Sequence, residues 1–575
     1  MTESKFGLER YTLDRFYSQV IQRFASRPAL ATVGEQPFTY AELGVRVETL
    51  KKSLSEMGIN RQDKIILLGH SSPQWAIAFM AITSMGAIAV PVLEDFPEVD
   101  IDHIIRHSEA VGIFIAQSQH TALNLRALED LKWVIRLDDF ELIQPSPESK
   151  SGFWKGLRRI PDKVLKSRER QDGLADTAID EEDIAEILYT SGTTGHSKGV
   201  LLTHKNLVSN AFEGPDLLGV IHEHSIILSI LPMAHAFGST SGFLSIIYCG
   251  ACIYYLNKTP SPKVLLAAMQ EVRPTILGAV PLVFEKIYHK QVLPTVARSP
   301  LLRLLAKTAG TRKILYKIIG KKINRLLGGR LSCVIIGGAS FSREVEIFMK
   351  QGRIPYCCGY GLSECAPLVT FSSMKTQKMG SPGHAVTDVS IRILQPDPES
   401  GIGEIVVKGP NVMKGYYKNE AATRSAFTPD GWFITGDRGY LDADGFLFIT
   451  GRSKNVIIGP SGENIYPESI EARLLESIFV EETLVYQLEG QLVARIYPNY
   501  AYIEGSDKEQ SEGAVARDIA QVLEQLRKEV NAQLPAFARI SRIIEQSTPF
   551  IKTPTNKIKR GEYVPGYLDN QGVHS

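Results

Sequence analysis

The chain alternates regularly between apolar, strand-like runs and amphipathic, helix-like stretches, and this alternation constrains the fold more than any other feature. The strand-like runs lie at 64–69, 87–93, 113–116, 133–137 and 331–336. Apolar runs of this length, separated by helical patterns, predict βαβ units, which build largely parallel sheets that are buried on both faces. We therefore expect an α/β fold.

The pattern of apolar and turn-forming residues changes at about residue 380. Short strand-like segments at 404–408 and 446–450 are separated by Gly, Pro, Asn and Asp, a pattern typical of a small β-rich unit. After residue 451 come two more strand-like segments and a charged helical stretch, at 482–488, 491–497 and 512–534. We expect this last part to fold as a separate α+β unit.

The length of 575 residues corresponds to about three or four domain-sized units. Together these patterns predict a large N-terminal domain of βαβ-type sheets over 1–451, with a small β-rich subdomain at about 380–451. They also predict a smaller α+β C-terminal domain over 452–575. The sequence shows no internal repeat.

Charge and cysteine content exclude several classes of protein. The chain has 64 basic and 63 acidic side chains, and this balance excludes a protein whose whole surface binds nucleic acid. Six cysteines are too few for a disulfide scaffold. The pair Cys249-x-x-Cys252 lacks a second pair at zinc-site spacing, and its flanks resemble buried strand. Because residues 1–10 are polar and contain no apolar signal core, we expect a cytoplasmic location.

Four segments bear on contact with membranes. The runs 75–93 and 225–257 are nearly or wholly free of charge, but Gly and Pro interrupt them, so we expect a helix followed by a buried strand in each. Segment 150–170 holds eight basic and two acidic residues, and segment 298–330 holds ten basic residues and no acidic one. Each basic segment fits a solvated helical face or peripheral contact with the inner face of an anionic membrane, and both interpretations stay open.

The sharpest local feature is the segment 189–200, YTSGTTGHSKGV, which follows a strand-like run at 184–189. Its glycines let backbone N–H groups approach an anion, and its hydroxyls and lysine add donors and charge. Its spacing differs from the Walker pattern, because only two residues separate the glycines and Gly199 follows Lys198. Taken alone, the segment fits a polyphosphate cradle or a solvated turn.

Five segments resemble, in order, the motifs of the AMP-forming acyl-CoA synthetases of the adenylate-forming superfamily. The first is 189–200, with Ser197 where the family usually has Pro. The others are 359–364 (GYGLSE), 431–437 (GWFITGD), 451–457 (GRSKNVI) with 462–467 (GENIYP), and 553–560 (TPTNKIKR). Five motifs in order make the resemblance specific. The pattern of 552–560 is most similar to the long-chain fatty acid–CoA ligase branch, although Leu282 stands where that branch often has Arg.

The resemblance implies two half-reactions, with ATP, Mg²⁺ and CoA as cofactor or co-substrates. The fatty acid carboxylate attacks the α-phosphate of ATP and releases pyrophosphate, and the thiol of CoA then attacks the acyl-adenylate. The alternative acceptor is the phosphopantetheine of an acyl carrier protein, since the motifs are shared. In this interpretation 1–451 is the ATP- and acyl-binding adenylation domain and 452–575 is mobile. No nucleic-acid partner is expected.

The resemblance also assigns roles to residues. The phosphates of ATP are assigned to Thr190, Ser191, Gly192, Thr193, Thr194, Gly195 and Lys198. The adenine, α-phosphate and acyl pocket are assigned to Gly338, Ala339, Tyr360, Gly361 and Ser363. Glu364 is the expected Mg²⁺ ligand, since Mg²⁺ prefers oxygen ligands. Asp437 and Arg452 are expected to contact the ribose.

Three further residues complete the predicted site. Lys557 is the expected catalytic lysine of adenylation, with Lys198 and Glu364 as the other residues of the catalytic set. The family commonly has Gly before this lysine, where this chain has Asn556. Lys454 lies at the family's hinge. His235, in a segment LPMAHAFG, is expected near the acyl carboxylate or, alternatively, as a structural histidine.

Overall fold

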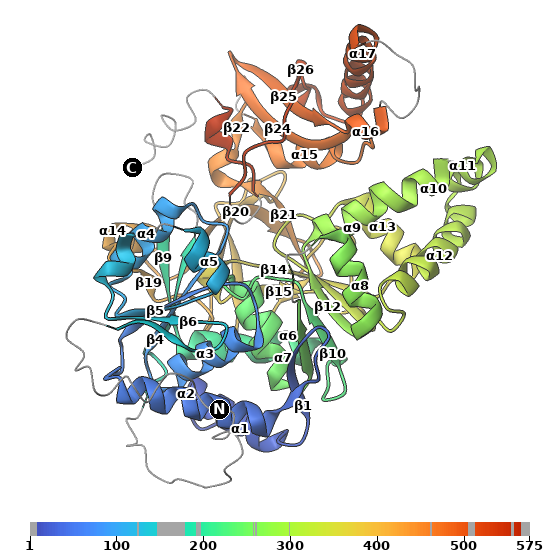
Figure 1. The fold of residues 1–575 in the computed structure, drawn as a ribbon. Coiled ribbons are helices and arrows are strands. Elements are labelled where there is room, and N and C mark those ends of the chain that lie inside the picture. Colours follow the sequence, from blue (N-terminus) through green and yellow to red (C-terminus); the bar gives the residue numbers. More distant parts are fainter. Residues whose placement is uncertain are drawn as a thin grey trace.

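The computed structural model describes residues 8–123, 126–145, 179–190, 197–256, 258, 261–297, 299–459, 463–503, 512–553 and 557–564. Two large sheets form the body of the molecule, and a small sheet and a terminal α/β unit lie above them in the view of Figure 1. The predicted α/β class is confirmed, with a large sheet-rich N-terminal part and a smaller C-terminal part.

The first sheet has eight strands in the order β19-β9-β8-β4-β3-β5-β6-β7. Its strands are β3 (Lys64–Leu68), β4 (Ile88–Val92), β5 (Gly112–Ile115), β6 (Trp133–Arg136), β7 (Leu142–Pro145), β8 (Ile184–Thr190), β9 (Lys198–Thr203) and β19 (Gly415–Tyr416). Its central strands β4, β3, β5 and β6 are parallel. They match the predicted apolar runs because both faces of this sheet are covered.

The second sheet has nine strands in the order β16-β15-β14-β13-β12-β10-β11-β1-β2. Its strands are β1 (Pro28–Thr32), β2 (Phe38–Thr39), β10 (Ile226–Ser229), β11 (Cys252–Tyr255), β12 (Ile276–Ala279), β13 (Cys333–Ile336), β14 (Tyr356–Gly361), β15 (Leu368–Phe371) and β16 (His384–Ala385). The predicted strand at 331–336 is therefore β13. The central strands β1, β11, β10, β12, β13 and β14 are parallel to one another.

Helices cover the sheets and fill the space between them. They are α1 (Leu13–Arg23), α2 (Tyr40–Glu56), α3 (Pro73–Ser84), α4 (Glu98–Ser108), α5 (Gln117–Ala122), α6 (His204–Leu218), η5 (Phe237–Leu244), α7 (Ser245–Tyr248), α8 (Pro262–Val272), α9 (Pro281–Ile287), η6 (Tyr288–Val292), α10 (Leu293–Ala297), α11 (Pro300–Lys307), α12 (Ala309–Leu326) and α13 (Arg343–Gly352). Helix α3 begins at Pro73, where the Ser72 hydroxyl accepts a hydrogen bond from the Trp75 N–H. Nearly every residue of α3 is buried, which explains the uncharged run at 75–93.

No helix in the described part of the chain combines the length and the apolar character needed to cross a membrane. The second uncharged run, 225–257, contains β10, η5, α7 and β11. The predicted strand on the N-terminal flank of Cys249 is wrong, because Ile246 and Ile247 lie in α7. Burial raises the pKa of the thiols of Cys249 and Cys252 to about 12, so both stay protonated and make poor metal ligands or nucleophiles.

The two large sheets repeat one topology that the sequence does not reveal. Strands β4-β3-β5-β6 in the first sheet have the same order and direction as β11-β10-β12-β13 in the second. The starts of β4 and β11, of α4 and α8, and of β5 and β12 are separated by the same number of residues. In each set the second strand along the chain pairs with one edge of the first strand, and the third strand pairs with its other edge. Open α/β sheets bind ligands at the carboxyl ends of the strands at such a point.

The small sheet has four antiparallel strands: β17 (Ser390–Leu394), β18 (Gly403–Lys408), β20 (Phe433–Leu441) and β21 (Leu447–Arg452). Helix α14 (Glu420–Ser425) and β19 lie between β18 and β20 in the sequence. The predicted strands at 404–408 and 446–450 are β18 and β21. Because β19 pairs with β9, part of this β-rich region belongs to the first sheet.

The C-terminal part has its own hydrophobic cores. It contains β22 (Ile457–Ile458), β23 (Asn464–Ile465), α15 (Pro467–Leu474), β24 (Val480–Leu488), β25 (Gln491–Pro498), α16 (Tyr500–Ile503), α17 (Glu512–Asn531) and β26 (Arg542–Glu545). Its two buried clusters consist only of residues from 457 onward. The predicted strands β24 and β25 and the predicted helix α17 are confirmed.

Candidate active site

The predicted phosphate loop connects two strands that form an antiparallel pair. Strand β8 ends at Thr190 and β9 begins at Lys198, and these residues are cross-strand partners in an antiparallel pair. The hydroxyl of Thr190 donates to the backbone oxygen of Lys198 at 3.5 Å. The remaining predicted ligands lie outside the described residues: Ser191, Gly192, Thr193, Thr194 and Gly195. A hairpin differs from the strand–loop–helix of a Walker site, as the spacing predicts.

Tyr416 connects Lys198 with Glu364. Tyr416 lies on β19, beside the strand that begins with Lys198. The Lys198 ammonium lies 5.1 Å from the centre of the Tyr416 ring, and the Tyr416 hydroxyl donates to Oε1 of Glu364 at 3.0 Å. Burial and the nearby Glu364 raise the pKa of Tyr416, so its hydroxyl stays a donor. The predicted phosphate cation and the predicted metal ligand thus share one aromatic neighbour.

Asp437 forms the centre of a second polar group. It is opposite Arg452 in the β20–β21 pair, and Nε of Arg452 lies 2.8 Å from its Oδ1. The hydroxyl of Tyr360 donates to its Oδ2 at 2.6 Å. Asp437 is only 4% exposed. Each carboxylate oxygen has more than one lone pair, so Asp437 keeps acceptor capacity beside these two partners.

An apolar pocket lies next to Tyr360. It is bounded by the end of α6, by η5, and by strands β13, β14 and β15, and its empty volume is about 650 Å³ with its open mouth included. The lining side chains are mainly aliphatic or aromatic, together with glycines: Gly214, Pro215, Leu218, Ile221, His235, Phe237, Ser241, Ser245, Ile335, Ile336, Gly337, Gly338, Gly359, Tyr360, Gly361, Leu362, Pro367, Leu368 and Phe371.

Two glycines of this wall cannot be replaced without a shift of the backbone. Gly338 has a φ of +87°, which side chains rarely adopt. A Cβ on Gly361 would lie 2.0 Å from the backbone oxygen of Pro367. Ala339 follows Gly338 and is exposed, and Ser363 lies between Gly361 and Glu364 in the chain. The motif glycines therefore shape the wall between the pocket and the polar groups.

His235 lies on the wall of the same pocket and is half-buried. Its Nδ1 accepts a hydrogen bond from the N–H of Phe237 at 3.2 Å. Burial, and then the positive charge of the nearby Lys557, lower the pKa of His235 to about 4. The imidazole is therefore neutral at pH 7.

Lys557 reaches this place from the far end of the chain. It interacts electrostatically with Arg452, Asp437 and Glu364, as well as with His235. By surface area the residue is exposed, yet the protein around its ammonium group removes part of the hydration and lowers its pKa. Arg452 lowers this pKa further, whereas Asp437 and Glu364 raise it.

The segment around Lys557 has internal backbone contacts, and ion pairs attach it to α15 and β24. The N–H of Thr553 donates to the backbone oxygen of Lys557 at 2.7 Å, and the N–H of Lys557 donates to the Thr553 hydroxyl at 3.2 Å. Arg560 donates to both carboxylate oxygens of Glu471 on α15 at 2.7 Å. Lys552 pairs with Glu482 at 2.6 Å. Lys557 thus projects from an anchored turn.

Lys454, the predicted hinge residue, follows β21 in a short turn at Ser453–Asn455. Partial burial, then Lys198 and Arg452, lower its pKa. The Lys454 ammonium therefore lies close enough to Lys198 for their charges to interact.

The structure brings together residues from both large sheets, the small sheet and the C-terminal part.

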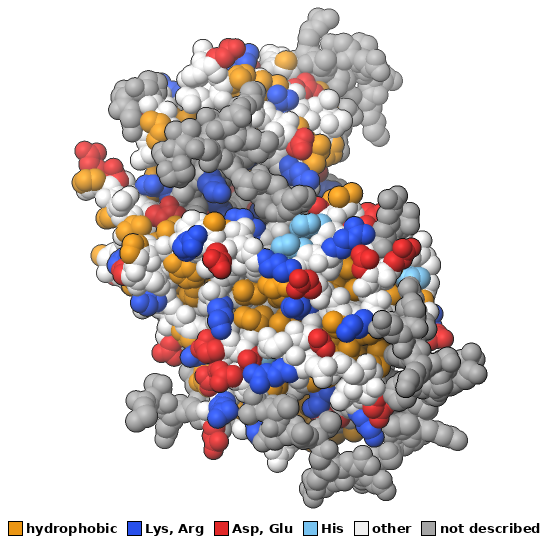
Figure 2. All heavy atoms as spheres, turned by 90° about the vertical axis from the view of Figure 1, so that its left-hand side faces the viewer, with side chains coloured by type: hydrophobic (Ala, Val, Ile, Leu, Met, Phe, Trp, Pro, Cys, Tyr) orange, Lys and Arg blue, Asp and Glu red, His pale blue; other side chains and the backbone are white. Residues whose placement is uncertain are grey.

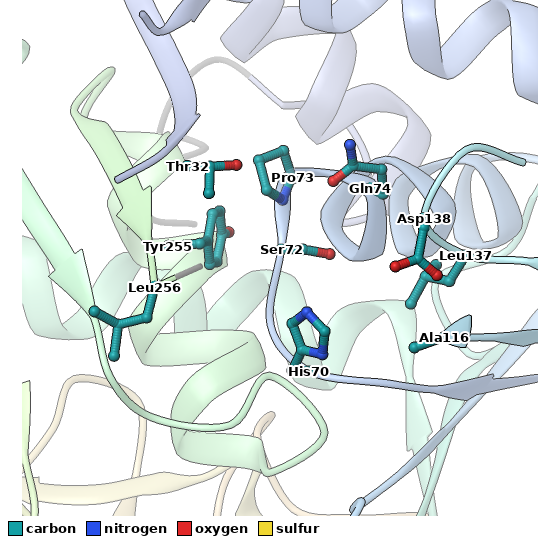
Figure 3. A pocket seen from close by; sticks show the side chains of 10 residues that line it. All are labelled: Thr32, His70, Ser72, Pro73, Gln74, Ala116, Leu137, Asp138, Tyr255 and Leu256. Carbon is teal, nitrogen blue, oxygen red and sulfur yellow. The ribbon is translucent and has the colours of Figure 1, made fainter. Parts of the chain in front are cut away.

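The equivalent point of the first sheet holds a different kind of pocket. It lies at the carboxyl ends of β3, β5 and β6, and Figure 3 shows its side chains, which include Thr32, His70, Gln74, Asp138 and Tyr255. Among the described residues, no Lys or Arg lines it. A polyphosphate needs cations to offset its charge, so the crevice of the second sheet, near Lys198, Lys557 and Arg452, is the better candidate.

Residues 17–417 match a protein family described as AMP-binding enzyme, and this match spans well over half of the chain. The chain belongs to this family. As an AMP-binding enzyme it is an adenylate-forming ligase by family, and the predicted resemblance to the AMP-forming acyl-CoA synthetases is confirmed.

Two relatives of this AMP-binding enzyme are named for a long-chain fatty acid but for different acyl acceptors. The long-chain-fatty-acid–CoA ligase FadD15 of Mycobacterium tuberculosis is 29% identical over 474 residues, which cover 78% of this chain and 74% of that protein. The chloroplastic long-chain-fatty-acid–[acyl-carrier-protein] ligase AEE15 of Arabidopsis thaliana is 27% identical, over 95% of this chain and 84% of that protein.

The solved structures share the fold of this AMP-binding enzyme. The O-succinylbenzoate coenzyme A synthetase MenE of Bacillus subtilis, in complex with ATP and a magnesium ion, aligns with a TM-score of 0.71. The alignment covers 95% of this chain and 98% of that one at 23% sequence identity. At this identity the similarity shows the fold alone.

Sequence reasoning missed two contributors to the site of this AMP-binding enzyme. Tyr416 lies in none of the five motifs, although it contacts both Lys198 and Glu364. Glu471 anchors Arg560 and has no local signal, because its partner is 89 residues away. Of this pair, the sequence indicated only Arg560, which is the last residue of the terminal motif.

Proposed function

We propose that this protein activates a long-chain fatty acid with ATP, releasing pyrophosphate, and then transfers the acyl group from acyl-AMP to CoA. The observation that carries the proposal is the position of Lys557, which lies within electrostatic range of Asp437, Glu364 and Arg452 and also of His235, a lining residue of the apolar pocket. A cation between a polar nucleotide-type site and an apolar pocket is where a carboxylate and an α-phosphate would meet.

In this proposal the polar groups bind the nucleotide. Asp437 and Arg452 contact the ribose, Tyr360 lies against the adenine, and Gly338 with Ala339 backs it. Thr190, Lys198 and the hairpin turn hold the phosphates, and Ser363 contacts the α-phosphate. The supporting geometry is the Asp437–Arg452 and Asp437–Tyr360 pairing and the nearness of Lys198 to Glu364 through Tyr416.

Glu364 fits a magnesium site of the kind completed by substrate. The described residues contain no group of three or more His, Cys, Asp or Glu side chains that could hold a metal alone. Mg²⁺ is commonly bound by one or two carboxylates together with substrate phosphates and water, and a single carboxylate beside a phosphate site suits that arrangement. When bound, the ion would neutralise charge on the phosphates.

The residues themselves supply position and charge. Both reactants at the first step are anions, so the Lys557 ammonium lowers their mutual repulsion as they approach. His235 is neutral and accepts from Phe237, so we assign it to the wall near the acyl carboxylate and not to proton transfer. The apolar wall of Leu218, Ile221 and Phe371 suits a hydrocarbon chain.

The long-chain preference is supported by names among the relatives and by the pattern of 552–560. FadD15 is named for a long-chain fatty acid, and so is AEE15, whose named acceptor is an acyl carrier protein. The match to AEE15 covers more of this chain than the match to FadD15, which makes a phosphopantetheine carrier the second candidate acceptor.

We further propose the division into an adenylation domain over 1–451, with its β-rich subdomain at about 380–451, and a mobile C-terminal domain over 452–575. The separate hydrophobic cores support this division. Rotation at Lys454 would withdraw Lys557 after adenylation and free the site for the thiol. We also propose a cytoplasmic enzyme that works at the inner face of a membrane.

The test is an assay of AMP release with acids from acetate to oleate, offering CoA or a holo-carrier protein in turn. We expect release that depends on ATP, Mg²⁺ and a long-chain acid, with CoA as the preferred acceptor. Faster turnover with the carrier protein would reverse the assignment of the acceptor. A lack of AMP release with every acid would refute the activity.

A further inference from the structure

Helices α10, α11 and α12 form an arm that projects from the body of the molecule (Figure 1). One side of α12 is anchored: Leu315, Tyr316, Ile319 and Ile323 are buried in the second hydrophobic core. The Tyr316 hydroxyl lies 3.1 Å from that of Tyr288, and the Tyr316 ring packs edge-on against Phe348 of α13. The orientation of the opposite side is therefore fixed by packing.

That opposite side of α12 exposes aliphatic side chains, and so does the adjacent helix α11. Ile314 and Ile318, one turn apart on α12, are 64% and 66% exposed, and Leu301 and Leu304 on α11 are 63% and 62% exposed. Residues three or four apart share a helix face. Leaving such side chains in water is unfavourable by about 25 cal/mol per Å² of apolar area, so a cluster of them needs a reason.

The same two helices are strongly basic. They contain eight Lys or Arg residues and no Asp or Glu: Arg303, Lys307, Arg312, Lys313, Lys317, Lys321, Lys322 and Arg325. Over the described part of the chain, none of these cations forms a salt bridge with a carboxylate. On the face shown in Figure 2, by contrast, basic and acidic side chains are interspersed.

We propose that the exposed face of α11 and α12 docks on an anionic phospholipid surface. Lipid headgroups offer phosphate charges for the exposed cations, which are all of these except the half-buried Arg312, and the acyl boundary below them accepts Leu and Ile side chains. A nucleic acid would satisfy the cations alone and would leave four aliphatic side chains in water. An aromatic platform for bases is also lacking on these two helices, because Tyr316 is buried.

This proposal adds to the proposed function the surface that contacts the membrane and the class of lipid that it binds. The attraction between this surface and the lipid does not depend on the reaction that the protein catalyses. Each Lys or Arg near an anionic surface strengthens the attraction, and a few inserted aliphatic side chains add to this. Such binding is reversible and sensitive to salt.

The experiment measures sedimentation of the full-length protein, without substrates, on vesicles of phosphatidylcholine mixed with an equal amount of phosphatidylglycerol. Vesicles of phosphatidylcholine alone are the reference. We expect at least about tenfold stronger partitioning to the anionic vesicles at low salt, and its loss at high salt. Equal partitioning to both kinds of vesicle would overturn the proposal.

Two double variants separate the contributions of charge and insertion. Lys313→Glu with Lys317→Glu, and Ile314→Ser with Ile318→Ser, should each reduce partitioning about tenfold or more. The matched controls are Lys52→Glu on α2 and Val99→Ser on α4, a side chain that is 76% exposed. These should bind vesicles as the unaltered protein does.

Two further readouts keep the test decisive. AMP release with a long-chain acid kept in solution by cyclodextrin, measured without vesicles, should be unchanged in all four variants, which shows that they are folded and separates this proposal from the proposed activity. Circular dichroism melting provides the same control if the protein has no such activity. A different outcome would overturn the proposal: weak binding to vesicles together with tight binding to heparin that the isoleucine substitutions do not change. The partner of this surface would then be a polyanion and not a lipid.

Discussion

Lys557 is the cation that the C-terminal part of the chain brings to the candidate site. The substitution Lys557→Ala should reduce acyl-adenylate formation by about a hundredfold or more, because charge held at the meeting point of two anions acts on the transition state. Thioester formation from supplied acyl-adenylate should be nearly unchanged. The two rates are measured by pyrophosphate release and by acyl-CoA formation.

Lys559→Ala is the matched control for this change, since Lys559 is exposed in the same segment. It should leave both half-reactions close to their original rates. An equal loss of both half-reactions in Lys557→Ala would contradict the assignment of Lys557 to adenylation alone.

His235 gives a prediction about pH. Because burial and then Lys557 lower its pKa to about 4, its imidazole stays neutral through the physiological range. The ring nitrogen signals of His235, followed by NMR in selectively labelled protein, should stay at their neutral positions down to about pH 5. His224, which is exposed, provides a comparison within the same spectrum. Protonation of His235 near the ordinary histidine value of about 6.5 would contradict this prediction.

At the scale of residues, the five motifs contain most of the polar residues that the structure brings together at the candidate site, because the chemistry of each side chain is evident from the sequence. They did not predict that Asp437 already has Tyr360 and Arg452 as partners, since those contacts depend on how β14 meets β20 and β21. Tyr416 was missed for the same reason: it acts through two contacts from different parts of the chain.

The terminal turn depends on α15 and β24. Arg560 and Glu471 are both only 13% exposed, and Glu468 is a more distant second partner at 3.6 Å, so the change Glu471→Gln removes the nearer counter-charge of a buried guanidinium. Removal of one member of a buried pair typically destabilises a fold by about 3–5 kcal/mol. We expect a lower melting temperature of the C-terminal part and slower adenylation, measured by calorimetry and by pyrophosphate release.

A surface pair in the same part of the chain is the control. Glu524 pairs with Arg527 on α17 at 2.7 Å, and Glu524 is 47% exposed. Glu524→Gln should change the free energy of unfolding by less than about 1 kcal/mol. If both substitutions had the same small effect, the Arg560–Glu471 pair would not be the anchor of the Lys557 turn.

At the scale of elements, the strands buried on both faces were predicted well, because a short, uncharged apolar run between two helical patterns is typical of a parallel strand covered on both sides. Ile246 and Ile247 were misassigned, since a short apolar run does not distinguish a buried helix from a buried strand. The pairing of β19 with β9 was invisible, because strand neighbours far apart in sequence leave no local pattern.

For the whole molecule, separate cores predict separate unfolding. Calorimetry without ligand should show two transitions. Leu523→Ala on α17 should lower only the smaller one and Leu228→Ala on β10 only the larger one, since both side chains are buried in different cores. Each substitution should destabilise its own part by about 2–5 kcal/mol. A single transition lowered equally by both would contradict the proposed domain division.

The repeated order of strands in the two large sheets was not foreseen, because the repeat lies in topology and not in residue identity. The sequence alone therefore predicted the fold class, whereas the choice between two equivalent crevices needed the positions of the charged side chains.

The pairing of β19 with β9 has one further consequence. It keeps Tyr416 one strand away from the start of β9, and neighbouring strands are spaced by about 4.8 Å whatever side chains they carry. The backbone positions from which the Lys198 and Tyr416 side chains extend are therefore set by the hydrogen bonds between the two strands. A substitution at the end of the connecting segment, such as Ser197 where the family usually has proline, leaves that spacing unchanged.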